Sequence, residues 1–66
     1  MRVFVNGEER DLPDGTSVAA VVATVTTAAS GVAAALNDEV VRRSEWDATT
    51  VREADRLEVL TAVQGG

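Results

Sequence analysis

One stretch of this sequence has the spacing of a helix with a single buried face, and that helix limits what the rest can be. Its apolar side chains recur at i, i+3, i+4 and i+7 and are Val18, Val21, Val22 and Val25. Thr16 or Ser17 can cap its start. Because valine and threonine are mediocre helix formers, this helix needs a sheet to pack against. The 66 residues include no cysteine, so neither a disulfide nor a thiolate metal site can replace that core.

A strand pattern precedes the helix. Residues 1–5 are rich in β-forming side chains, and Asn6-Gly7 is a strong signal for a two-residue hairpin turn. Residues 8–12 can return as the partner strand, and Pro13-Asp14-Gly15 forms a turn into the helix. The sequence therefore predicts that the chain begins with a β-hairpin.

A second strand pattern follows the helix. Residues 32–36 and 39–41 are predicted to form a short hairpin around the turn Asn37-Asp38. Residues 56–60 alternate apolar and polar side chains, as a half-buried last strand does. Trp46, the only tryptophan, is expected to pack at the edge of the core.

This order of elements predicts an α+β protein of the β-grasp type, a mixed sheet of about five strands packed on one main helix. We expect residues 1–61 to form the domain and residues 62–66 to form a flexible C-terminal tail. The side chains expected to face the helix are Val3, Val5, Val18, Val21, Val22, Val25, Val32, Ala34, Leu36, Leu57 and Val59. Phe4 and Leu60 fall on the outer face, where they would form one exposed apolar patch and a docking surface for a partner.

The composition excludes several classes of function. The chain has no histidine, cysteine or lysine, so it lacks the usual proton shuttle and covalent nucleophiles, and we expect no enzyme activity and no catalytic residue. The net charge of −5 opposes nucleic acid and favours a basic protein surface as partner. Glu8 and Glu9 lack further ligands, so no metal site is expected. Neither a signal peptide nor a membrane span is evident, so a cytoplasmic monomer is expected.

The sequence ends on two glycines. Gly65 and Gly66 remove every Cβ from the end of the chain, so its backbone can pass through a narrow channel and approach a nucleotide closely. The five residues from Ala62 to Gly66 span roughly 17 Å when extended, which is enough to enter a cleft while the folded body stays outside. Their carboxylate is an anion at neutral pH and can attack the α-phosphorus of ATP.

Several motifs together resemble the ThiS family, the sulfur carriers of thiamine biosynthesis. The resemblance covers nearly the whole chain, and its most specific parts are the R-S-x-W stretch, Arg43 to Trp46, and the A-V-Q-G-G ending, Ala62 to Gly66. Further matching stretches are Asn6-Gly7-Glu8, Leu12-Pro13-Asp14-Gly15 and the segment from Asp55 to Thr61. Position 42 is arginine where the family often has proline, which puts local geometry in doubt but does not touch the tail.

The resemblance implies a ubiquitin-like carrier. A ThiF-like adenylyltransferase would consume ATP and Mg²⁺ to adenylate Gly66, and the adenylate would become a thiocarboxylate with sulfur from a donor such as a cysteine desulfurase. A ThiG-like thiazole synthase would then take the sulfur. Ala62, Val63, Gln64 and Gly65 would thread the partner's active site, and the carrier itself would bind no cofactor.

Three other functions stay open from the sequence. A MoaD-like carrier for molybdopterin synthesis also ends in two glycines, but it is usually longer and lacks this pair of motifs. A ubiquitin-like modifier would join Gly66 to a lysine of another protein. A TGS-like binding module would share the opening from Leu12 to Ser17, yet it would not need the two terminal glycines.

Overall fold

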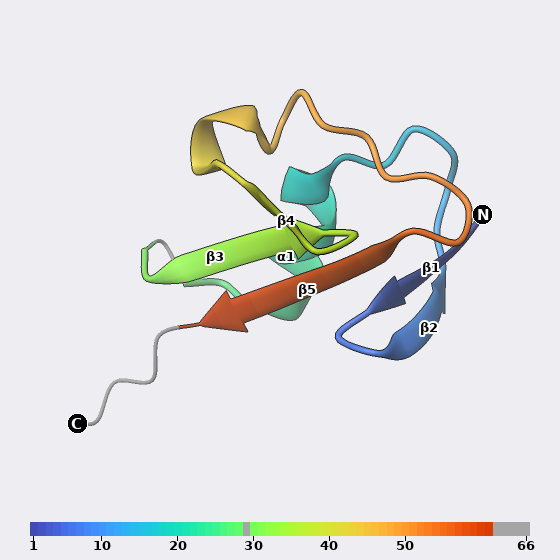
Figure 1. The fold of residues 1–66 in the computed structure, drawn as a ribbon, viewed down its shortest axis with the longest axis horizontal. Helices are drawn as coiled ribbons and strands as arrows, with labels where there is room; N and C mark the ends of the chain where they lie inside the picture. The colour runs from blue at the N-terminus through green and yellow to red at the C-terminus, as the bar shows by residue number, and fades with distance from the viewer. Residues whose placement is uncertain (29, 62–66) are drawn as a thin grey trace.

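The computed structural model describes residues 1–28 and 30–61, and these form the predicted β-grasp fold (Figure 1). Its elements are β1 (Arg2–Val5), β2 (Glu8–Asp11), α1 (Val18–Val25), β3 (Val32–Leu36), β4 (Glu39–Val41), the 3₁₀ helix η1 (Arg43–Glu45) and β5 (Arg56–Thr61). The sequence predicted all five strands and α1 close to these bounds, but not η1. The tail predicted over residues 62–66 lies outside the described residues.

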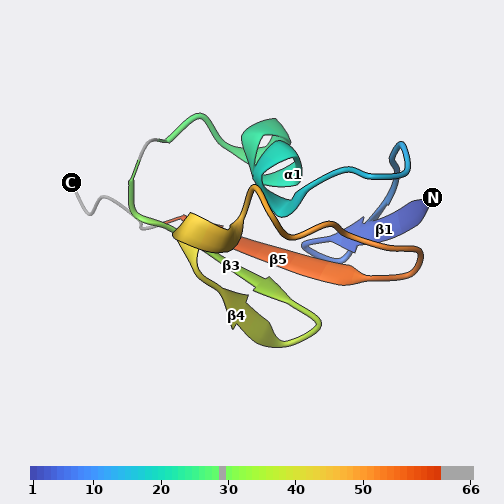
Figure 2. The same ribbon diagram turned by 90° about the horizontal axis from the view of Figure 1, so that it is seen from above.

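The strands form one mixed sheet in the order β2-β1-β5-β3-β4. Strand β5 is parallel to β1 and antiparallel to β3, and both hairpins are antiparallel. The last strand of the chain is therefore the central strand of the sheet (Figure 1). Helix α1 lies across one face of the sheet, as Figure 2 shows, and the opposite face is called the outer face below.

Helix α1 begins at Val18 because Ser17 caps it. Ser17 is extended, and its Oγ accepts a hydrogen bond from the N–H of Ala20 at 3.1 Å, which satisfies one free donor of the first turn. The helix ends at Val25, since Thr26 returns to extended backbone. Its eight residues are too few to cross a membrane, and no other helix in the described part of the chain is long and apolar enough to do so.

The core lies between α1 and the inner face of the sheet. Its buried side chains are Val3, Val5, Val18, Val21, Val22, Ala34, Trp46, Val51, Leu57 and Val59. Three residues expected there, Val25, Val32 and Leu36, are only partly buried and pack against its rim. Most of the predicted core is thus confirmed.

Two core residues come from the segment between β4 and β5. Trp46 is only 7% exposed, as its expected packing role requires, and its Nε1–H donates to the carbonyl of Val41 at 2.8 Å. Val51, which the sequence did not place in the core, is 1% exposed, and its N–H donates to the carbonyl of Thr16 at 3.0 Å. These side chains add bulk that the alanines of β3 do not supply.

Candidate functional site

The five residues from Ala62 to Gly66, which carry the predicted chemistry, lie outside the described residues. The structure describes the strand from which they continue. Strand β5 is held into the core by Leu57, which is fully buried, and by Val59, which is 4% exposed. The strand that leads into these residues is therefore anchored in the core of the sheet.

On one side, β5 is held by β1 and then by a side chain. The N–H of Phe4 donates to the carbonyl of Asp55, and the N–H of Asn6 donates to that of Leu57, both at 2.9 Å. Strand β1 ends at Val5, and the register joins it to β5 only at Arg56 and Leu57. Beyond that point the Oδ1 of Asn6 accepts a hydrogen bond from the N–H of Val59 at 2.8 Å.

On its other side, β5 is paired along almost its whole length. The register with β3 runs from Leu36 opposite Leu57 to Val32 opposite Thr61. Before it, Asn37 binds Arg56 twice: the Oδ1 of Asn37 accepts from the N–H of Arg56 at 2.9 Å, and the N–H of Asn37 donates to its carbonyl at 2.7 Å. The sequence marked Asn6 and Asn37 as turn residues but gave no sign that their side chains hold β5.

The two predicted docking residues share the outer face but do not adjoin. Phe4 is partly buried and lies opposite Arg56, while Leu60 is 67% exposed and lies four residues further along β5. Four residues of strand correspond to about 13 Å. Arg56 and Glu58 occupy the outward positions on that stretch. The single apolar patch expected from the sequence is therefore two separate groups, because the parallel register sets Phe4 beside the start of β5.

Leu60 has apolar neighbours of its own on that face. Ala33 lies directly opposite it, and in the next row Ala35 lies between Glu58 and Val40. The side chain of Val40 is 79% exposed, which is more than that of any other large apolar residue in the described part of the chain. The sequence placed Val40 in a strand but did not add it to the docking surface, although its alternation with Val41 was the available signal.

Phe4 lies in a charged setting. It lines a hollow of about 290 Å³ together with Gly7, Asp38, Arg56, Leu57 and Glu58. Arg56 reaches across to Asp38, with 3.2 Å between Nη2 and Oδ2. The outer face around Phe4 thus combines an aromatic surface with exposed acids and one arginine, which suits a polar partner more than an apolar one.

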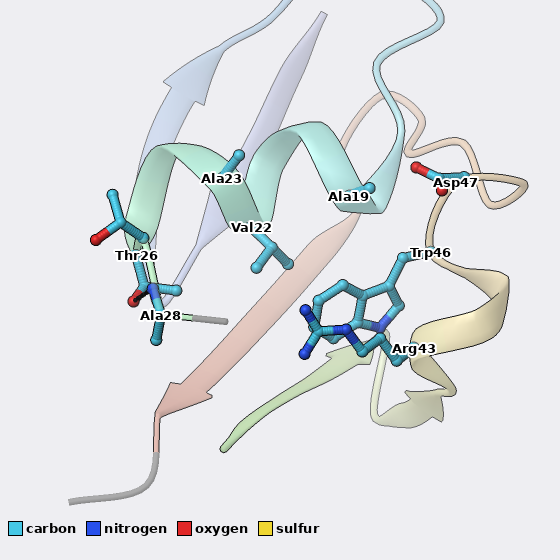
Figure 3. Close-up of a pocket in the computed structure, with 9 residues that line it drawn as sticks. Ala19, Val22, Ala23, Thr26, Ala28, Arg43, Trp46 and Asp47 are labelled. Carbon is cyan, nitrogen blue, oxygen red and sulfur yellow. Dashed lines mark hydrogen bonds between the residues drawn. The ribbon is translucent and has the colours of Figure 1, made fainter. Parts of the chain in front are cut away.

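A second hollow, of about 400 Å³, lies on the helix side of the sheet (Figure 3). Ala19, Val22 and Ala23 of α1 form one wall, and Arg43 and Trp46 form the opposite wall. The guanidinium carbon of Arg43 lies 5.3 Å from the centre of the Trp46 ring, within the range of a cation–π contact. The R-S-x-W motif thus stabilises the packing of the segment after β4.

Among residues 1–28 and 30–61, no three acidic, histidine or cysteine side chains are grouped so that they could hold a metal ion. The expectation that the chain binds no metal and no cofactor stays a prediction.

The chain is similar to known proteins in both sequence and structure. The profile of the ThiS family matches residues 3–66. A crystal structure of a thiamine biosynthesis protein (ThiS) from Geobacter metallireducens is 32% identical, with a TM-score of 0.80 and full coverage of both chains. An NMR structure of a thiamine biosynthesis protein from the same organism is 33% identical, with a TM-score of 0.81 over all of this chain and 88% of that one. No curated protein sequence matched. The chain belongs to the ThiS family.

Proposed function

We propose that this protein carries sulfur for the thiazole ring of thiamine on the carboxylate of Gly66. Membership of the ThiS family, and similarity to two structures described as thiamine biosynthesis proteins, support a sulfur carrier of thiamine biosynthesis. The observation that carries the proposal is the position of β5: it is the central strand, it is held on both sides, and it leads into the A-V-Q-G-G stretch from Ala62 to Gly66.

The first step is activation of Gly66 by a ThiF-like adenylyltransferase. The Gly66 carboxylate attacks the α-phosphorus of ATP, pyrophosphate leaves, and Mg²⁺ on the enzyme offsets the charge of the phosphates. The product is a mixed anhydride of the carboxyl group and AMP. This step turns an unreactive carboxylate into an acyl group with a good leaving group.

The second step brings in sulfur. The terminal sulfur of a persulfide on a donor, such as a cysteine desulfurase, attacks the acyl carbon and AMP leaves. A thiol then attacks the remaining sulfur–sulfur bond, which releases the thiocarboxylate of Gly66 and leaves a disulfide on the other product. A ThiG-like thiazole synthase takes the sulfur from that thiocarboxylate. The carrier is a substrate of these enzymes and not itself the catalyst.

The remaining parts of the chain serve recognition. Ala62, Val63, Gln64 and Gly65 enter the partner's active site, and Gly65 lets the backbone pass closely through a narrow channel because it has no Cβ. The outer face, with Phe4 at one end and Leu60 at the other, meets the body of the partner. The net charge of −5 favours a basic surface there.

Intact-mass spectrometry tests the proposal directly. The carrier is incubated with ATP, Mg²⁺, a ThiF-like enzyme and a persulfide donor, and we expect a mass increase that matches replacement of one oxygen by one sulfur. A carrier without Gly65 and Gly66 is the control and should stay unchanged. No mass change with an enzyme that activates another carrier in the same assay would contradict the proposal.

The fate of the thiocarboxylate separates the alternatives. Consumption by a thiazole synthase supports the thiamine role, whereas consumption by a molybdopterin synthase in its place would favour a MoaD-like carrier. Recovery of the chain joined through Gly66 to lysines of other proteins would favour a protein modifier.

A further inference from the structure

We propose that Asn6 is a positioning residue for the reaction at Gly66: its side chain fixes the direction in which β5 delivers the C-terminal segment to the activating enzyme. This inference rests on the proposed function, because it concerns how the carboxylate reaches ATP. It is carried by the hydrogen bonds along the β1 side of β5.

Backbone groups of β5 and of the residue before it face β1. The carbonyls of Asp55 and Leu57 accept from the N–H groups of Phe4 and Asn6, at 2.9 Å each. The next group is the N–H of Val59, and by then the backbone of β1 has ended. The carboxamide oxygen of Asn6 accepts from it at 2.8 Å, across a separation of 53 residues in sequence. One side chain thus extends the ladder beyond its strand.

Position 6 requires a backbone with positive φ and a side chain that accepts a hydrogen bond, and asparagine provides both. The backbone of Asn6 has a φ of 52°, in the left-handed region that asparagine, aspartate and glycine adopt most readily. Its side chain is short enough to hydrogen-bond to nearby backbone, and Oδ1 supplies the acceptor. Glycine would tolerate the same φ without supplying an acceptor, and aspartate would supply both.

The contact lies where a small rotation has a large effect. Val59 is two residues before Thr61, and the five residues after Thr61 can span about 17 Å. With these five residues held extended in the partner's active site, a rotation of the strand end by about 10° would displace the carboxylate relative to the folded body by about 3 Å. The carboxylate and the α-phosphorus of ATP must meet within a fraction of that distance. We therefore expect loss of the Asn6 contact to slow the adenylation step itself.

The second hairpin provides a matched control. Asn37 has a φ of 51°, and its Oδ1 also accepts from an N–H of β5, at 2.9 Å. That N–H belongs to Arg56, at the start of the strand and far from its C-terminal end. The two carboxamide oxygens therefore make the same kind of contact, and only that of Asn6 lies near the tail. Asn37 also donates from Nδ2 to the Oδ1 of Asp55 at 3.0 Å, an exposed contact before the start of β5.

The test compares Asn6→Gly, Asn6→Asp and Asn37→Gly with the wild-type carrier. AMP transfer by the purified ThiF-like enzyme is measured against carrier concentration, at a temperature where circular dichroism shows every variant folded. We expect Asn6→Gly to lower kcat by about tenfold with little change in KM, because the outer face is intact. We expect Asn6→Asp to restore most of the rate and Asn37→Gly to behave as wild type.

Several outcomes would overturn the inference. These are a wild-type kcat for Asn6→Gly, an equal loss in Asn37→Gly, no recovery in Asn6→Asp, or a change confined to KM. Amide exchange measured by NMR supplies a readout that needs no enzyme. The Val59 amide should be protected in the wild type and lose protection in Asn6→Gly but not in Asn37→Gly. Rapid exchange of this amide in the wild type would overturn the inference even where Asn6→Gly fails to fold. Failure of the wild type to be adenylated would count against the proposed function instead.

Discussion

The two hairpins of the sheet are built on the same plan and stabilised in different ways. Each turn starts with an asparagine at positive φ whose carboxamide oxygen accepts an N–H of β5. In the first hairpin, Val3 and Val5 of β1 reach the core directly and are almost fully buried. In the second hairpin, Ala34 is the only residue of β3 that is buried. A small side chain leaves space that another part of the chain must fill.

Trp46 fills that space for the second hairpin. It packs into the core from the segment after η1, and its Nε1–H binds the carbonyl of Val41 in β4. The first hairpin therefore carries its own core side chains, while the second depends on residues that come after it in sequence. The comparison teaches that similar strands and turns need not have similar sources of stability.

Removal of Trp46 should have the largest effect and should act through the second hairpin. We expect Trp46→Ala to lower the free energy of unfolding by about 3–5 kcal/mol, because it leaves a large cavity and removes the hydrogen bond that Nε1 donates to the carbonyl of Val41. Urea unfolding followed by circular dichroism measures this, since the variant has no tryptophan to report by fluorescence. The matched change in the first hairpin, Val3→Ala, should cost about 2 kcal/mol. A smaller loss for Trp46→Ala than for Val3→Ala would contradict the comparison.

Exchange of the two asparagines for glycine should have a smaller and nearly equal effect on stability. We expect Asn6→Gly and Asn37→Gly each to lower the free energy of unfolding by about 1 kcal/mol. Glycine keeps the positive φ at both positions, but each variant loses the side-chain acceptor for one N–H of β5. The same denaturation experiment compares them. If only Asn6→Gly lowered the free energy of unfolding, its loss of AMP transfer would be explained by reduced stability and not by the direction of β5.

Substitutions at the second position of each turn should have effects no larger than these, and the change at Asp38 should be the smallest. Gly7 has a φ of +80°, and a Cβ there would meet no atom within 4 Å, so Gly7→Ala should cost about 1 kcal/mol through backbone strain alone. Asp38 has a φ of 71° and forms an exposed ion pair with Arg56. Asp38→Gly relieves the backbone and loses that pair, so we expect a change within about 0.5 kcal/mol. Thermal unfolding of both variants would show whether the turns differ in this way.

The sequence predicted most of the fold because its local signals agree with the final structure. The valine stripe of α1, its cap at Thr16 or Ser17 and the turn Asn6-Gly7 each depend on residues close in sequence. The structure confirms them and places the cap at Ser17. The strand over residues 32–36 was also predicted despite its alanines, and it is β3. Such features follow from backbone preference and periodicity alone.

What the sequence missed depends on contacts between distant residues. Val51 lies in a segment whose apolar residues follow neither the helix nor the strand spacing, so the sequence gives no sign that it is buried. Its burial comes with its contact to the turn before α1. The separation of Phe4 from Leu60 follows from the parallel register with β5, which no local pattern specifies. The hydrogen bond from Val59 to Asn6 spans 53 residues and has no signal in either segment.

The central position of β5 has a consequence for how the protein is made. A ribosome synthesises β1, β2, α1, β3 and β4 before it reaches β5, yet β1 and β3 are joined in the sheet only through that strand. Until then, the nascent chain holds two separate hairpins, and isolated two-stranded hairpins are at best marginally stable in water. Closing the parallel pair of β1 and β5 also requires contact between segments from nearly opposite ends of the sequence, which slows folding. We therefore expect folding to follow the synthesis of β5, so that a nascent carrier has no folded body for its enzymes to recognise before that strand has been made.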